Sequence, residues 1–251
     1  MIVALLSDVH ANLEALQAVL ADMKARGVQE ALGLGDYIGF NGNPSECVNL
    51  VRPHLIAAVR GNHEAALLDR GVFGLPMYTR MMDRTQAMLD AEQVAWLRSL
   101  PNHVDWRGYL LGHATPEAPK RWGRIVNVNE ARKVFHAVRA RVSFFGHTHR
   151  ATIFRLCKGE VEKLEIDYGP QGDFALHLRS DCRYLINPGS VGQPRDLDWR
   201  AAYGLFCPET NTLHLRRVAY DVSETGHKIA RTGLPESFAE ALLHGTSPTG
   251  D

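Results

Sequence analysis

The sequence has few cysteines, no excess of charge of either sign and no long apolar run. Its four cysteines, Cys47, Cys157, Cys182 and Cys207, form no C-x-x-C pair, which argues against a disulfide framework and a thiolate zinc site. We therefore expect reduced thiols and a cytoplasmic protein. Lysine and arginine together number 28, as do aspartate and glutamate, so no global field would draw the chain to nucleic acid or to an anionic membrane.

No apolar run approaches the roughly 20 residues that a transmembrane helix needs. The apolar segment 1–6 has no cationic flank or small-residue cleavage site and runs directly into Ser7 and Asp8, so it predicts a buried strand instead of a signal peptide. The remaining composition, 45% hydrophobic and 22% charged over 251 residues, is typical of a soluble globular protein. We expect one domain over 1–251.

In the first hundred residues, strands alternate with helices. Apolar runs predict strands at 2–6, 31–34 and 55–59, and apolar spacing predicts helices after Asn12, after Asn43-Pro44 and over much of 64–100. Each strand runs into a polar residue: Asp8, Asp36 or Asn62. Ligands of open α/β sheets gather outside the carboxyl ends of the strands. We therefore expect these three side chains to converge.

From Val104 onward the pattern changes to short alternating runs. They predict strands at 104–106, 109–112, 142–145, 152–156, 161–166, 174–178, 183–186, 203–206 and 212–218, with helices at 129–139 and 235–243. We predict an α/β fold of the α+β type, in which two mixed sheets pack as a sandwich flanked by helices. The strands after Val104 are expected to form the second, largely antiparallel sheet.

Twelve histidines are the unusual feature of the composition, and several follow predicted strands. In chain order the polar strand ends are Asp8-x-His10, Gly35-Asp36, Gly61-Asn62-His63-Glu64, Gly112-His113 and Gly146-His147-Thr148-His149. Carboxylate, imidazole and amide ligands suit manganese, iron or zinc. Two such ions about 3.5–4 Å apart can screen an anionic phosphoester and acidify a water. The pattern predicts a dinuclear hydrolytic centre, with the Asp36 carboxylate as the natural bridge.

These elements resemble the calcineurin-like metallophosphoesterase superfamily, which carries D-x-H, G-D, G-N-H-[DE], a G-H or H-G element and G-H-x-H in that order. The resemblance covers the first 150 residues or so. Two later pieces, 186–192 (I-N-P-G-S-V-G) and 193–196 (Q-P-R-D), resemble the small bacterial and archaeal phosphodiesterase-like branch and extend the match to about residue 206. The resemblance implies a four-layer αββα architecture.

The resemblance also implies a role for each residue of the centre. Asp8, His10 and His149 would hold one metal, Asn62, His113 and His147 the other, and Asp36 would bridge them. His63 would protonate the leaving oxygen or stabilise charge on the phosphate, while a metal-bridging hydroxide attacks in line. The cofactors would be two divalent ions, Mn²⁺ first, with Fe, Zn, Ni or Mg as alternatives. Alanine follows His113 where the family usually has glycine.

Simpler interpretations stand beside these roles. Asp8 and Asn62 could cap helices, and His63 could be an orienting group. Arg150 and Arg195 could grip a phosphate oxygen or be solvated turn residues. Aromatic residues beside the strands could stack on a nucleobase or simply pack; they are Tyr37, Phe40 and Trp122. The other histidines are expected to be structural or surface residues: His54, His103, His136, His177, His214, His227 and His244.

The predicted function is phosphodiester hydrolysis of a small phosphoester or nucleotide-type substrate. A phosphoprotein phosphatase or a diadenosine-polyphosphate hydrolase would use the same residues, and a binding scaffold without catalysis would have no need of His63. Specificity is expected to lie in loops 37–45, 64–85 and 115–128. We expect no membrane contact and no stable nucleic-acid complex, and the sequence leaves a homo-oligomer open.

Overall fold

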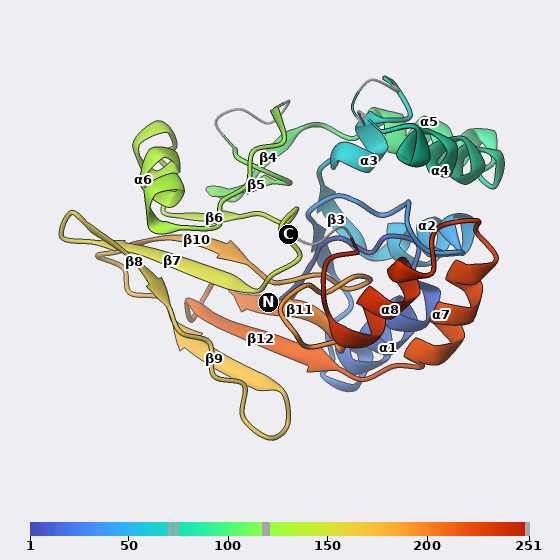
Figure 1. Ribbon diagram of the computed structural model, residues 1–251. Helices are drawn as coiled ribbons and strands as arrows, with labels where there is room; N and C mark the ends of the chain where they lie inside the picture. The colour runs from blue at the N-terminus through green and yellow to red at the C-terminus, as the bar shows by residue number, and fades with distance from the viewer. Residues whose placement is uncertain (70–71, 73–74, 117–120, 249–251) are drawn as a thin grey trace.

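Two mixed six-stranded sheets pack face to face in the computed structural model, which describes residues 1–69, 72, 75–116 and 121–248 (Figure 1). The first sheet has the order β3-β2-β1-β11-β12-β9 and the second β4-β5-β6-β10-β7-β8. The strands are β1 (Val3–Leu6), β2 (Ala31–Gly33), β3 (Leu55–Ala58), β4 (His103–Trp106), β5 (Tyr109–Gly112), β6 (Val142–Phe144), β7 (Thr152–Cys157), β8 (Glu160–Leu164), β9 (Asp173–His177), β10 (Arg183–Asn187), β11 (Ala201–Cys207) and β12 (Thr212–Val218).

Helices cover the outer face of each sheet, which gives the expected four layers. They are α1 (Leu13–Ala25), α2 (Pro44–Val51), the 3₁₀ turn η1 (Arg52–His54), α3 (Asn62–Ala65), α4 (Pro76–Ala87), α5 (Ala91–Ser99), α6 (Val128–Ala137), α7 (Val222–Ala230) and α8 (Ser237–His244). Helix α1 packs on β11 and β12 of the first sheet, and α6 packs on β7 and β8 of the second (Figure 1). Helix α7 is not among the helices predicted from the sequence.

The strands lie where the sequence predicts them, but their division between the sheets differs from the prediction. Strands β9, β11 and β12 belong to the first sheet, where β11 runs antiparallel to β1. The physical reason lies in β1, whose four residues are all buried. Its backbone needs hydrogen-bond partners on both edges, and parallel β2 supplies only one of them. The second sheet is mixed, because β6 is parallel to both β5 and β10 whereas β7 is antiparallel to β10.

The alternation along β1 serves two separate cores. Val3 and Leu5 face the second sheet and pack in the core between the sheets. Ala4 and Leu6 face the helices and pack in the core beneath α1. Because one strand contributes to both cores, its position is tightly fixed, and the residues that follow it start from a rigid base.

Two cysteines correct the expectation of reduced thiols. Cys157, at the end of β7, and Cys182, just before β10, are joined as a disulfide. The absence of a C-x-x-C pair does not exclude this bond, because β7 and β10 are adjacent antiparallel strands that bring residues distant in sequence together. Cys47 and Cys207 are free thiols. Within the described residues, no helix combines the length and apolarity needed to cross a membrane.

The segment after β10 packs tightly against the segment after β1. Backbone N–H groups of Val191 and Gly192 donate to the carbonyls of Ser7 and Asp8, each at 2.9 Å, and the Ser190 hydroxyl donates to the Asp8 carbonyl at 2.8 Å. A Cβ on Gly192 would lie 1.8 Å from the Val9 carbonyl oxygen. The glycine is therefore what allows the two backbones to approach so closely.

We expect Gly192→Ala to lower the free energy of unfolding by roughly 3 kcal/mol, at the upper end of the cost of overpacking, because the added methyl meets backbone. Urea denaturation followed by circular dichroism measures the change. The control is Gly226→Ala in α7, where a Cβ would meet only the Ala239 methyl at 3.9 Å; it should raise stability by about 0.5–1 kcal/mol. Equal stability of the two variants would contradict the packing argument.

Candidate metal centre

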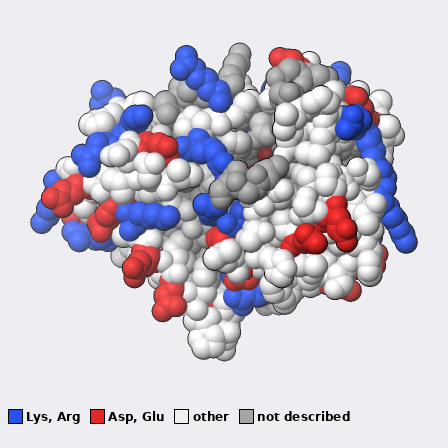
Figure 2. Space-filling model, in the orientation of Figure 1, with Lys and Arg blue, Asp and Glu red and all other residues white. Residues whose placement is uncertain are grey.

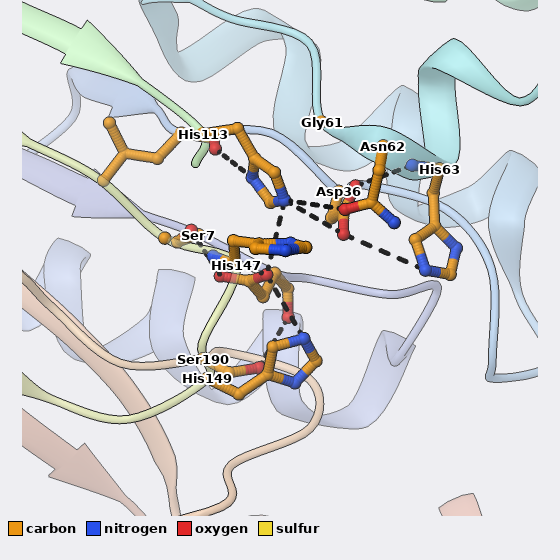
Figure 3. Close-up of polar contacts among 12 residues, drawn as sticks. Ser7, Asp36, Gly61, Asn62, His63, His113, His147, His149 and Ser190 are labelled. Atoms are coloured by element: carbon orange, nitrogen blue, oxygen red, sulfur yellow. Dashed lines mark hydrogen bonds and ion pairs between the residues drawn. The ribbon is translucent and has the colours of Figure 1, made fainter. Parts of the chain in front are cut away.

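The polar residues that follow five strands meet in one cluster, as the sequence predicts. Strands β1, β2 and β3 end before Asp8, Asp36 and Asn62, and β5 and β6 of the other sheet end before His113 and the His147–His149 pair. All of these side chains are buried except His147, which is half-buried. Figure 3 shows Asp36, Asn62, His113, His147 and His149 converging on a common space. The centre therefore lies where the carboxyl ends of strands from both sheets come together.

Two groups of potential ligand atoms share a single carboxylate. The atoms of Asp8, His10, Asp36 and His149 lie within 4.8 Å of one another, and so do those of Asp36, His113 and His147. Asp36 Oδ2 is 3.6 Å from His10 Nε2 in the first group and 3.2 Å from His113 Nε2 in the second. Asn62 Oδ1 lies 3.2 Å from His113 Nε2 and joins the second group. The arrangement could hold two cations with Asp36 between them.

Each histidine of these groups has one ring nitrogen fixed by a backbone carbonyl. Nδ1 of His10, His113 and His149 lies 3.2, 2.7 and 2.7 Å from the carbonyls of Ile38, Leu34 and Gln193, and His147 Nε2 lies 3.0 Å from that of Trp122. A carbonyl oxygen only accepts, so the contacting nitrogen carries a proton, and in the neutral ring the other nitrogen has the lone pair. Metal-binding histidines are typically oriented in this way.

The backbone of the centre is held in an unfavourable conformation. Positive φ angles, which L-residues rarely adopt, occur at Asp8 (53°), His10 (48°), Asp36 (57°), His147 (67°) and His149 (59°). Such strain persists only where the surroundings over-determine it, and it clusters at functional sites. The sequence offered little sign of this feature, because none of these residues is glycine.

Two glycines allow carboxylates to pack against backbone. A Cβ on Gly61 would lie 2.0 Å from Asp36 Oδ1, and one on Gly146 would lie 1.9 Å from Ser7 Oγ. Ser7 Oγ donates to Asp8 Oδ2 at 2.5 Å. The reason for a glycine at Gly61 and Gly146 is thus this close approach. It does not apply at Gly112, where the nearest atom, in Pro116, would be at an ordinary 3.6 Å.

Glu64 is a residue of the centre whose role the sequence motifs do not indicate. Its carboxylate is fully buried and accepts hydrogen bonds from the backbone N–H groups of Asp36, Tyr37 and Gly61, each at 2.8 Å. Glu64 therefore ties the loop after β2 to the loop after β3. The only sequence signal was its place in Gly61-Asn62-His63-Glu64.

Burial and mutual proximity shift the titration of the whole cluster. Burial raises the pKa of Asp8 to about 7, although the nearby His113 charge opposes the shift. For Asp36, burial also acts to raise the pKa, but His113 and His63 outweigh it and hold the pKa well below the usual range. Burial acts to lower the pKa of His113, yet the Asp36 carboxylate raises it to about 9. The carboxylates thus attract positive charge to this point.

His63 lies beside the cluster, at the edge of a small cavity. Its Nε2 is 3.9 Å from Asp36 Oδ2, and burial lowers its pKa to about 4. The cavity has a volume of about 180 Å³ and is lined by Asp36, Phe40, Asn62, His63, Tyr78, His147, His149 and Arg195. The guanidinium of Arg195 lies 5.9 Å from the centre of the Phe40 ring. Phe40, Tyr78 and Arg195 therefore form the wall beside the metal-binding cluster.

The remaining predicted residues lie apart from this cavity. Arg150 Nε donates to the Arg195 carbonyl at 3.0 Å, so Arg150 supports the Arg195 segment. Tyr37 is fully buried in the core beneath α1, and Trp122 meets the centre through its carbonyl and its ring, 6.1 Å from that of His113. Residues 70–71, 73–74 and 117–120 of the predicted specificity loops are outside the described residues.

The seven other histidines lie away from the cluster, as expected. His54 Nδ1 contacts the Gln29 carbonyl at 2.9 Å, and His214 lies 3.5 Å from Asp173. The other five are exposed: His103, His136, His177, His227 and His244. Both signs of charge are interspersed over the face drawn in Figure 2, in keeping with a net charge of zero.

Comparison with known proteins agrees with this geometry. Residues 1–209 match the calcineurin-like phosphoesterase superfamily domain. A metallophosphoesterase from Sphaerobacter thermophilus, known from its crystal structure, is 36% identical, with a TM-score of 0.85 and coverage of 98% of this chain and 99% of that one. An uncharacterized protein of Methanocaldococcus jannaschii is 34% identical over 97% of this chain and 98% of its own length.

A hypothetical protein from Pyrococcus horikoshii shares the fold, with 19% identity, a TM-score of 0.75 and coverage of 98% and 99% of the two chains. The chain belongs to the calcineurin-like phosphoesterase superfamily. It is a metallophosphoesterase with a buried cluster of aspartate and histidine side chains suited to metal binding.

Glu64→Gln should weaken Mn²⁺ binding by about 10- to 100-fold, the usual effect of losing a residue that orients metal ligands. The amide nitrogen cannot accept a hydrogen bond, so at least one of the three backbone N–H groups loses its partner. Isothermal titration with Mn²⁺ measures the change. The control is Glu130→Gln, because Glu130 accepts from the Val126 N–H at 2.8 Å on the exposed start of α6. Similar affinity in both variants would show that Glu64 does not organise the centre.

Proposed function

We propose that this protein hydrolyses phosphodiesters with the help of two divalent cations, Mn²⁺ being the favoured ion. The observation that carries the proposal is the Asp36 carboxylate, shared by two groups of ligands whose histidine nitrogens are already oriented by backbone carbonyls. The oxygen and imidazole donors suit Mn²⁺, Fe or Zn. The whole chain, 1–251, would act as one domain, since α7 packs on α1.

The first ion would be held by Asp8, His10 and His149, and the second by Asn62, His113 and His147, with Asp36 shared between them. When bound, the two cations supply the positive charge that screens the phosphate and the acidity that makes water a nucleophile near neutral pH. The positions of the donor atoms support this division, because the two groups of atoms within 4.8 Å overlap only at Asp36.

His63 would stabilise charge on the phosphate or, once the bound anionic phosphate favours its protonated form, donate a proton to the departing alkoxide. It lies in the cavity wall, 3.9 Å from Asp36, and its ring centre is 4.6 Å from that of His10. Arg195 would hold a non-bridging phosphate oxygen, because its guanidinium lies at the same cavity and a guanidinium matches phosphate geometry. The sequence predicted a role for His63 and offered one for Arg195, and both residues line this one cavity.

Preference for a diester is supported by the aromatic wall of the cavity. A diester brings a second organic substituent, which an apolar surface can bind, and a single negative charge, which demands less cationic compensation than a monoester dianion. Phe40 and Tyr78 offer that surface, with ring centres 6.1 Å apart. Arg195 is the cationic side chain that lines this cavity among the described residues.

We expect Mn²⁺-loaded protein to hydrolyse bis(p-nitrophenyl) phosphate with a kcat/KM at least about tenfold above that for p-nitrophenyl phosphate. His63→Ala should lower kcat by about 10²- to 10⁴-fold, the usual contribution of a positioned general acid. Asp36→Asn should abolish turnover and reduce the metal content measured by inductively coupled plasma mass spectrometry. His136→Ala, a change of an exposed histidine in α6, is the matched control and should behave as wild type.

A higher kcat/KM for the monoester would favour a phosphatase. Two bound ions per chain without turnover of either ester, across Mn²⁺, Fe²⁺, Zn²⁺, Ni²⁺ and Mg²⁺, would favour a binding scaffold. If His63→Ala retained wild-type kcat, the proton donor would have to be another group. These outcomes distinguish the reaction class from the role of His63.

A further inference from the structure

Helices α7 and α8 lie outside the segment that matches the superfamily domain, 1–209, and α8 contacts the wall of the active-site cavity through Phe238. Figure 1 shows the two helices side by side near α1. Lys228 of α7 forms an ion pair with Glu14 of α1, and the Thr225 hydroxyl lies 3.1 Å from Asn12 Oδ1. The pair is therefore anchored to α1, whose first residue follows the β1 loop of the centre.

The first contact with the cavity wall is made by Phe238 of α8. This side chain is 2% exposed, and its ring centre lies 5.7 Å from that of Phe40. On the cavity side, the Phe40 ring lies 4.6 Å from the rings of both His10 and His63. Phe40 thus stands between the C-terminal helix and the residues assigned to catalysis.

Phe40 needs such support because its backbone is strained. Its φ of +62° lies in the left-handed region, which an aromatic residue adopts only when its surroundings hold it there. Its N–H donates to the Met81 sulfur at 3.2 Å, and the Asn41 amide beside it donates to the His10 carbonyl at 2.8 Å. Phe238 packs on the ring itself, from the side of the C-terminal helix.

The second contact is made by the end of α8. The Leu197 N–H donates to the Gly245 carbonyl at 2.9 Å, and a Cβ on Gly245 would lie 2.6 Å from the Asp198 nitrogen. Leu197 and Asp198 follow Arg195, whose guanidinium lies over the Phe40 ring. One helix therefore braces both sides of the Phe40–Arg195 contact, although the two residues are far apart in the sequence.

We infer that Phe238 is a positioning residue for substrate binding: α8 holds Phe40 and the Arg195 segment so that the guanidinium faces the phosphate. The inference rests on the proposed function, in which Arg195 binds a phosphate oxygen. Phe238 packs on Phe40, and Phe40 in turn contacts His63 and Arg195, so the effect of Phe238 should pass through Phe40. It should therefore change substrate affinity more than the chemical step or the metal content.

Phe238→Ala should raise KM for bis(p-nitrophenyl) phosphate about tenfold with kcat within about threefold of wild type, the pattern of lost ground-state binding. The inhibition constant of inorganic phosphate should rise in parallel, and metal content should not change. Phe238→Leu, which keeps an apolar side chain against Phe40, should restore KM to within about threefold of wild type. Unchanged KM in Phe238→Ala, where Arg195→Ala raises it, would overturn the inference.

The matched control is Phe135→Ala. Phe135 is buried in α6, on the outside of the second sheet, and 4% exposed, so its loss also empties a core site but should leave KM unchanged. An equal rise of KM in both variants would show a general effect of destabilisation and would contradict a positioning role. Leu243→Ala, on the exposed side of α8, should leave all constants unchanged.

If Phe238→Ala does not fold, Gly245→Ala is the deciding variant. Its added methyl would displace the Asp198 backbone, while Phe40 keeps its packing against Phe238, and KM should rise. Unchanged KM in that variant would then overturn the inference. Failure of the proposed function is distinguishable, since wild-type protein would itself show no diester turnover. Wild-type turnover with a KM indifferent to α8 would reject only the inference.

Discussion

The Asp36 carboxylate, buried between three histidines, is the interaction on which the site depends. His113 Nε2 is 3.2 Å from Asp36 Oδ2, and His10 and His63 lie 3.6 and 3.9 Å from the same oxygen. A buried carboxylate is costly unless charge and hydrogen bonds surround it, and the Asp36 side chain accepts from the His63 N–H at 2.9 Å. The strained loops around it are arranged so that these partners reach one point.

That arrangement requires a rigid base, which the sandwich supplies. Strand β1 contributes to the cores on both of its faces, and the 187–193 segment is hydrogen-bonded to the residues that follow β1. Backbone carbonyls then fix the outer nitrogen of each histidine in the two groups. The histidine orientation is therefore set by main-chain geometry and needs no further side chain.

Much of this could be predicted from the sequence, because strand ends and metal-ligand residue types leave local patterns. The runs before Asp8, Asp36 and Asn62 predict parallel strands whose ends share one edge, and the structure brings these residues together. Sheet membership could not be predicted, since the pairing of β11 with β1 joins residues about two hundred positions apart. The disulfide between Cys157 and Cys182 likewise depends on the pairing of strands that are separated in the sequence. The role of Glu64 also depends on the fold, because its carboxylate accepts hydrogen bonds from the backbone of Asp36 and Tyr37.

The same reasoning explains why the cavity wall was harder to predict than the metal-binding cluster. Ligands are limited to a few residue types, whereas a wall is built from ordinary packing residues such as Phe40, Tyr78 and Phe238, whose partners depend on the whole fold. Phe40 in the left-handed region is unfavourable on local grounds, so its conformation must come from tertiary contacts with His10, His63 and Phe238. The metal-binding residues can thus be predicted from local patterns at the strand ends, whereas the shape presented to a substrate depends on contacts that extend to the C-terminal helix.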